Sequence, residues 1–136
     1  MKKLFTLFIV VLFTQILPTQ YIDAQTTNNA SVKLIRALET GNADALATLF
    51  NDNVELVLPK TENFFTKQQA KSILTDFFKK NPVIDFNVLH KGNKENAYFI
   101  IGTIVSSRGS FRVSVFSRKS GTQTFVYQLR IEDPNE

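Results

Sequence analysis

Between residues 30 and 81, three segments carry apolar residues every three or four positions, the spacing of one face of a helix. The pattern predicts a helix from Ala30 to Gly41-Asn42, followed by a short second helix that Asn42 caps. A third helix is predicted after a capping-box pair, Thr66 and Gln69, and ends at Asn81-Pro82. Its expected apolar face consists of Ala70, Ile73, Leu74, Phe77 and Phe78.

From Val83 onward the apolar spacing changes to every second residue, which is typical of β-strands. Four strands are expected, and the three short connections between them all contain glycine, as in an antiparallel meander. A shorter strand is expected earlier, between a break at Asn51-Asp52-Asn53 and Pro59. These strands are predicted at residues 54–58, 83–91, 97–106, 110–118 and 122–132.

Helices that precede a run of strands indicate an α+β domain, with three N-terminal helices packed on a curved antiparallel sheet. Alternation assigns Phe111, Val113 and Val115 to the helix-covered face of one strand. In the last strand it assigns Phe125, Tyr127, Leu129 and Ile131 to the same face.

The strand at residues 97–105 is apolar on both faces: Phe99, Ile101 and Val105 alternate with Tyr98, Ile100 and Ile104. A strand of this kind is normally covered on both sides. The helices cover one side. The other side is covered either by a second subunit, which gives a homodimer, or by sheet curvature and a long loop.

The first 24 residues have the features of a secretory signal peptide. Lys2-Lys3 is followed by a mainly apolar run at residues 4–17, then by Pro18 and by the small residue Ala24. The apolar run has about 14 residues, whereas a membrane-spanning helix needs about 20, so a stable membrane anchor is disfavoured. We therefore expect a protein exported to the periplasm or the extracellular space, with one domain at residues 25–136 and a polar, unstructured start at residues 25–29.

The composition is that of one globular domain: 136 residues, 43% of them hydrophobic, with thirteen Phe. The formal net charge is +4, and loss of Lys2, Lys3 and Asp23 with the leader leaves +3, too little for a nucleic-acid binder. Cysteine is absent, which excludes disulfides and thiolate chemistry. One His and no Cys argue against a metal site, and no phosphate-binding loop or nucleophile elbow points to a cofactor.

The order helix, helix, short strand, helix and long meander resembles the cystatin-like α+β fold of the nuclear transport factor 2-like superfamily. Residues 37–54 are similar to its opening, in which a link such as Gly41-Asn42 joins two helices and a segment such as residues 49–54 enters the first strand. More closely, almost the whole mature chain resembles a family of short secreted Bacteroidetes proteins, domain of unknown function 4783. This match is carried by Phe77-Phe78, Leu89-His90-Lys91-Gly92, Ile101-Gly102-Thr103, Gly109-Ser110-Phe111-Arg112-Val113 and Leu129-Arg130-Ile131.

The superfamily resemblance implies a cone with a pocket between the concave sheet and the helices, in which some members bind ligands, dimerise or catalyse isomerisation or dehydration. Isomerase-like members have an Asp as general base directly before a Pro, whereas Leu58 precedes Pro59 in this chain. Those members also have a Tyr in the first helix, and residues 30–39 contain none. The expected base and donor are both missing, which disfavours an enzyme.

Three residues are candidates for a pocket: His90, Tyr127 and Thr103. Alternation places His90 with Phe86 and Val88 on the core side, where a histidine near a pocket is a candidate general acid or base. A histidine at the end of a strand, bonded to backbone near Gly92, is the simpler interpretation, because His90 has no identified partner. Similarly, Tyr127 presents its hydroxyl either to a pocket or to the edge of the core.

Four residues are candidates for a partner surface: Tyr98, Arg112, Arg130 and Glu132. The last three lie on the outward faces of adjacent strands, where they either bind an anionic partner or pair with one another.

The favoured hypothesis is therefore an exported, non-enzymatic binding module with a small-ligand pocket or a protein-partner surface. The alternatives are a pocket enzyme, an isomerase, dehydratase or hydrolase that uses His90 with Tyr127, and a structural protein whose two-sided strand forms a large dimer interface. The identity of the ligand remains open.

Overall fold

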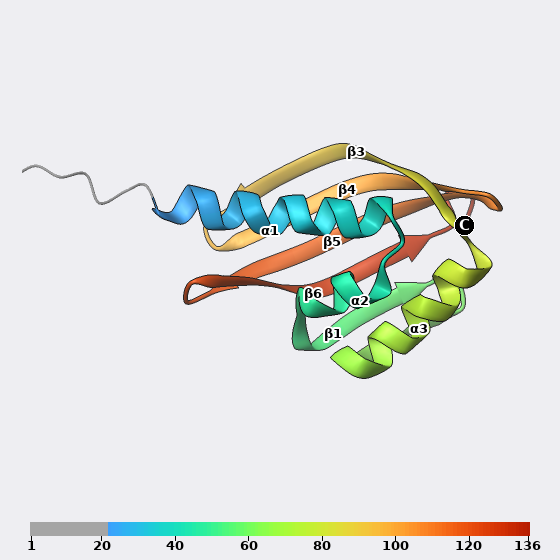
Figure 1. The fold of residues 1–136 in the computed structure, drawn as a ribbon, viewed down its shortest axis with the longest axis horizontal. Coiled ribbons are helices and arrows are strands. Elements are labelled where there is room, and N and C mark those ends of the chain that lie inside the picture. The colour runs from blue at the N-terminus through green and yellow to red at the C-terminus, as the bar shows by residue number, and fades with distance from the viewer. Residues whose placement is uncertain (1–21) are drawn as a thin grey trace, which may run out of the picture.

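In the computed structural model, which describes residues 22–136, three helices lie on one face of a curved six-stranded sheet (Figure 1). The predicted α+β class is therefore confirmed. The predicted leader lies outside the described residues except for its last three, which begin the first helix. The elements are α1 (Ile22–Glu39), α2 (Ala43–Thr48), β1 (Phe50–Leu58), β2 (Thr61–Thr66), α3 (Lys67–Lys80), β3 (Val83–Lys94), β4 (Ala97–Ser106), β5 (Gly109–Ser120) and β6 (Gln123–Glu132).

The strands are arranged in the order β2-β1-β6-β5-β4-β3. The predicted meander of β3 to β6 is confirmed, with antiparallel pairing throughout. β1 joins it by parallel pairing to β6. The sixth strand, β2, was not predicted, because within it only Phe65 packs against the core and an alternating pattern is absent. It forms an antiparallel edge pair with β1.

Several boundaries differ from those expected from the sequence. β3 runs to Lys94, three residues past its predicted end at residue 91, so Gly92 lies within the strand and not in the turn. Residues 25–29 are helical, because α1 begins at Ile22 and not at Ala30. No Gly or Pro interrupts the chain between Ile22 and Glu39. Residues 51–53, expected as a break, belong to β1, which begins at Phe50 with a pairing to Val126. The break appears instead as a register irregularity between Phe50 and Glu55, with residues 51–53 exposed.

We call the helix-covered face of the sheet the inner face and the opposite face the outer face. The core lies between the helices and the inner face, and the predicted apolar faces of the helices point into it. Burial of these side chains, each worth roughly 1.5–3 kcal/mol, is the main stabilising contribution. The largest fully buried side chains are Phe50, Leu38, Leu46, Leu56, Leu74, Ile104, Leu129 and Ile131.

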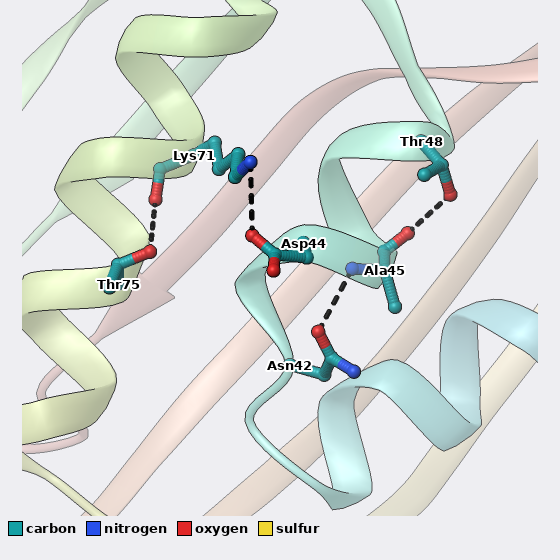
Figure 2. Close-up of polar contacts among 6 residues, drawn as sticks. All are labelled: Asn42, Asp44, Ala45, Thr48, Lys71 and Thr75. Atoms are coloured by element: carbon teal, nitrogen blue, oxygen red, sulfur yellow. Dashed lines mark hydrogen bonds and ion pairs between the residues drawn. The ribbon is translucent and has the colours of Figure 1, made fainter.

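One ion pair joins α2 to α3, and the other polar contacts drawn in Figure 2 lie within each helix or its cap. Asn42 caps α2 as predicted, because its Oδ1 accepts the backbone N–H of Ala45 at 3.0 Å. Lys71 of α3 lies beside Asp44 of α2, with its Nζ 3.2 Å from Asp44 Oδ1. The pair is largely exposed, so it contributes at most about 1 kcal/mol and mainly orients the two helices.

The predicted capping box of α3 is also present. The backbone N–H of Gln69 donates to Thr66 Oγ1 at 3.3 Å, and the backbone N–H of Thr66 donates to Gln69 Oε1 at 3.1 Å. At the other end, Asn81 caps the helix before Pro82, as the sequence predicts.

Gly102 is packed too tightly to accept a side chain. It lies on the inner face of β4, where a Cβ atom would be 2.5 Å from the backbone oxygen of Asn87 and 2.7 Å from the ring of Phe86. We therefore expect Gly102→Ala to lower the free energy of unfolding by about 1–3 kcal/mol through overpacking, as measured by urea denaturation. Ser110→Ala, at an exposed position of β5, is the control and should change it by less than about 0.5 kcal/mol. Equal stability of the two variants would contradict this packing.

Candidate functional site

The space between α1 and the sheet is nearly filled. A hollow there, walled by Leu34 of α1, Ile100 of β4 and Val126 of β6, has a volume of about 20 Å³. That volume holds about one water molecule. The pocket implied at this place by the family resemblance is therefore too small in this chain for an organic ligand.

Tyr98, predicted as a partner-surface residue, lies on the inner face. It is half-buried and lines the same small hollow beside Ala30 and Ser31 of α1. Alternation along β4 then places Phe99 on the outer face, directly opposite Phe116 of β5. Tyr98 consequently belongs to the contact between helix and sheet.

His90 does not point into the core, contrary to the alternation-based prediction. The pairing of β3 with β4 shifts between Val88, which is opposite Gly102, and His90, which is opposite Ile101. Leu89 is the extra residue of this β-bulge, and one extra residue reverses the faces of all that follow. His90 is therefore exposed on the outer face.

Tyr127 is moved to the outer face by a second bulge. Phe116 of β5 is opposite Gln128 of β6, but the next residue, Ser117, is opposite Val126, so Tyr127 is the extra residue. The prediction that Phe125 and Tyr127 face the helices is therefore wrong, and Val126 takes the core position. Leu129 and Ile131, beyond the bulge, are fully buried as predicted.

The outer side chains around Tyr127 are aromatic and basic. Its ring centroid lies 6.4 Å from that of Phe116, and the guanidinium carbon of Arg118 lies 5.1 Å from the Tyr127 ring. A guanidinium at this distance from an aromatic face makes a favourable cation–π contact.

Thr103, the third pocket candidate, is half-buried on the outer face between Asn87 of β3 and Arg112 of β5. All three pocket candidates thus share the outer face, but they are not brought together. His90 lies on β3 and Tyr127 on β6, and three strand spacings separate them by about 14 Å. None of the three lines a hollow between the sheet and the helices.

The outer face carries an apolar band across β4, β5 and β6, which we define as Phe99, Ile101, Phe116 and Tyr127. Each is half-buried with no helix above it. On the same face of β1, Val57 is only 6% exposed and lies opposite Arg130. The sequence expectation of a strand that is apolar on both faces is therefore confirmed for β4.

Three of the four predicted surface candidates meet at one end of this face. Arg112 of β5 lies opposite Glu132 of β6. Arg130 is on the same strand as Glu132, two positions earlier in the sequence. Together with Glu62 and Asp133 they line a hollow of about 460 Å³ that also involves the C-terminal segment. The sequence did not indicate the participation of Glu62, because it lies on the unpredicted strand β2.

Arg130 is the centre of an ionic network in this hollow. Its Nη2 donates to Glu132 Oε1 at 2.9 Å. This hydrogen bond, with the charges of Glu132, Glu62 and Glu55, raises the pKa of Arg130 against the opposing effect of burial. Glu55 is itself held by Gln128, whose Nε2 donates to Glu55 Oε2 at 2.5 Å. A guanidinium is protonated at all ordinary pH values, so the raised pKa of Arg130 adds no pH dependence of its own near neutral pH.

Within residues 22–136, no three side chains of the metal-ligating types His, Cys, Asp and Glu come together as a cation site. In the same part of the chain, no helix combines the length and the apolar character needed to cross a membrane.

One family of known sequences matches this chain. The model of the domain of unknown function DUF4783 matches residues 31–132. No curated protein matches the chain in sequence.

Solved structures agree in family and fold. A DUF4783 family protein from Bacteroides ovatus is 36% identical, with a TM-score of 0.72 over 76% of this chain and 94% of that one. One from Bacteroides uniformis is 30% identical, with a TM-score of 0.73 over 77% of this chain and 97% of that one. A nuclear transport factor 2-like protein of unknown function from Cytophaga hutchinsonii is 17% identical and supports the fold alone, with a TM-score of 0.58 over 81% of this chain and 92% of that one.

The Arg130 network predicts a measurable coupling. In a double-mutant cycle of Arg130→Gln and Glu132→Gln, we expect a coupling energy of about 0.5–1 kcal/mol from urea denaturation, because both side chains are partly shielded from solvent. The exposed pair Lys67–Asp52, at 3.6 Å, is the control cycle and should couple more weakly. Additive effects at Arg130 and Glu132 would contradict the network.

Proposed function

The chain belongs to the DUF4783 family, with a nuclear transport factor 2-like fold, and from this premise we propose that it is an exported, non-enzymatic binding module that acts through the outer face of its sheet. The observation that carries this proposal is the apolar band of Phe99, Ile101, Phe116 and Tyr127. All three helices lie on the other side of the sheet. Within residues 22–136, α3 connects β2 to β3 and short turns join the other strands that follow one another directly, so no long loop of this part of the chain lies over the band.

A second copy of the chain is the partner that fits this face best. A two-fold interface must be complementary to itself, because the same patch is used by both subunits. The outer face has an apolar centre, guanidinium groups from Arg112, Arg118 and Arg130, and carboxylates from Glu55, Glu62 and Glu132. Both signs of charge occur beside the apolar band, so a two-fold arrangement can place basic groups of one copy opposite acidic groups of the other.

The size of the face supports the same partner. Six strands span about 24 Å and ten residues of strand extend about 33 Å, which gives a face on the order of 800 Å². A stable interface buries about 800 Å² on each partner. A homodimer would therefore use most of the outer face.

The alternative of a pocket enzyme that uses His90 and Tyr127 has little geometric support. A general acid and base must both reach one substrate within hydrogen-bond distance. The two side chains are separated by about three strand spacings, or 14 Å, on an open face. Leu58, at the position of the general base in isomerase-like relatives, is buried among core residues.

Export by the leader is part of the proposal. Expressed with its leader in a Gram-negative host, the protein should be recovered outside the cytoplasm with Gln25 as its first residue, as determined by intact-mass spectrometry. Ala24→Arg should block processing, because signal peptidase needs a small residue at this position, whereas Asn29→Arg should be processed normally. An exported product that keeps residues 1–24 would contradict cleavage after Ala24.

Self-association is tested by the solution mass of the exported protein. Light scattering and sedimentation should give a dimer at micromolar concentration. Ile101→Lys, which puts a charge in the apolar band, should give a folded monomer. Val32→Lys, a comparable change at a 63% exposed position of α1, should remain dimeric.

Arg112→Glu provides a second variant at an exposed site, where loss of the fold is not expected. It should raise the dimer dissociation constant by about tenfold, since it places like charges together across the interface. A parent protein that is monomeric up to about 100 µM, well above the range of stable dimers, would overturn the choice of a second copy.

A further inference from the structure

A groove on the helix side of the sheet lies apart from the outer face. It forms where the C-terminal half of α3 meets the turn between β1 and β2 and the hairpin between β4 and β5. Its volume is about 520 Å³, within the usual range for sites that bind small molecules. None of the residues predicted for a pocket contributes to it.

The floor of the groove is apolar. Phe77 of α3 and Phe111 of β5 pack edge to face, with ring centroids 5.2 Å apart and planes at 71°. Leu58 and Ile73 complete the apolar surface. Aromatic pairs in this geometry are favourable beyond the area they bury, which stabilises this arrangement of the floor.

The rim of the groove is mainly basic. Lys60, Lys80 and Arg108 line it, and Asp76 is the one acidic residue among the lining side chains described. The ion pairs formed within the described residues do not involve any of these three cations. The rim therefore has a formal charge of +2, which no ion pair among residues 22–136 neutralises.

The end of α3 does not cancel this charge. A helix C-terminus has a partial negative charge from carbonyls without partners. Here the Phe77 carbonyl accepts both the backbone N–H of Asn81 at 2.9 Å and the Asn81 side-chain amide at 3.0 Å. Lys80 lies in the same last turn and opposes what remains of the dipole.

From this arrangement we infer that the groove binds a small amphipathic anion. Its apolar body lies against Phe77 and Phe111, and its carboxylate or sulfonate lies at the rim between Lys60, Lys80 and Arg108. The inference does not depend on self-association, because the groove and the outer apolar band are on opposite sides of the sheet.

The probe for this site is 1-anilinonaphthalene-8-sulfonate, an aromatic body with one anionic group. Fluorescence titration of the exported protein should give saturable binding that weakens as NaCl is added, since salt screens exposed charges. Lys80→Glu should weaken binding by roughly threefold to tenfold, because it replaces an attraction with a repulsion. Asp76→Asn should strengthen binding by about twofold to threefold, because it removes the one carboxylate of the rim.

Lys79→Glu is the matched control. It changes the net charge by the same amount in the same helical turn, but Lys79 lines a different hollow, so binding should stay within about twofold of the parent. Equal weakening by Lys79→Glu and Lys80→Glu would overturn the site. Thermal denaturation of each variant establishes that it is folded.

Competition separates the two parts of the ligand. Decanoate should displace the dye, whereas decanol and inorganic phosphate at the same concentration should displace it at least fivefold less effectively. Equal displacement by decanol would overturn the role of the basic rim. Equal displacement by phosphate would overturn the role of the apolar floor.

Discussion

Side chains alternate between the two faces of a β-sheet, and one extra residue in a strand reverses that alternation from that point on. This protein has such a residue in two of its long strands, at Leu89 in β3 and at Tyr127 in β6. The bulge in β6 lets Val126 and Leu129 both face the helices, although they are three positions apart, an odd number that regular alternation would place on opposite faces. The same bulge brings Tyr127 beside Phe116 on the outer face. A third insertion lies at Ile84 of β3, because Val83 is opposite Ser106 whereas Asp85 is opposite Val105. The composition of the outer face therefore follows in part from three local insertions in β3 and β6.

The filled interior is the second constraint. Apolar side chains of α1 and the inner face meet closely enough to leave about 20 Å³ between them. Leu58 is buried at the end of β1, where isomerase-like relatives place a carboxylate. A buried carboxylate without a partner would be costly at this position, whereas Leu58 packs with the core residues. The polar and charged groups of the chain collect instead on the outer face and at the ends of the helices.

The two surfaces that result differ in physical character. The outer face is broad, with an apolar band and charges of both signs, which suits a large, self-complementary partner. The groove beside α3 is narrower, with two packed aromatic rings under a basic rim, which suits a small anion with an apolar body. They lie on opposite sides of the sheet, so occupation of one does not exclude occupation of the other.

Local periodicity was enough to predict all three helices, the capping box at Thr66, the meander and the α+β class, because each depends on residues within a few positions. It did not reveal β2, which has little alternation and is stabilised by pairing with β1. It also placed His90 and Tyr127 on the wrong face, because a bulge depends on the register of a neighbouring strand.

The charged cluster around Arg130 joins β2, β5 and β6, and the groove joins α3 to two turns distant in sequence. The sequence by itself determined the elements and most of the core; only the tertiary structure decided the faces and the sites, since these depend on contacts between distant segments.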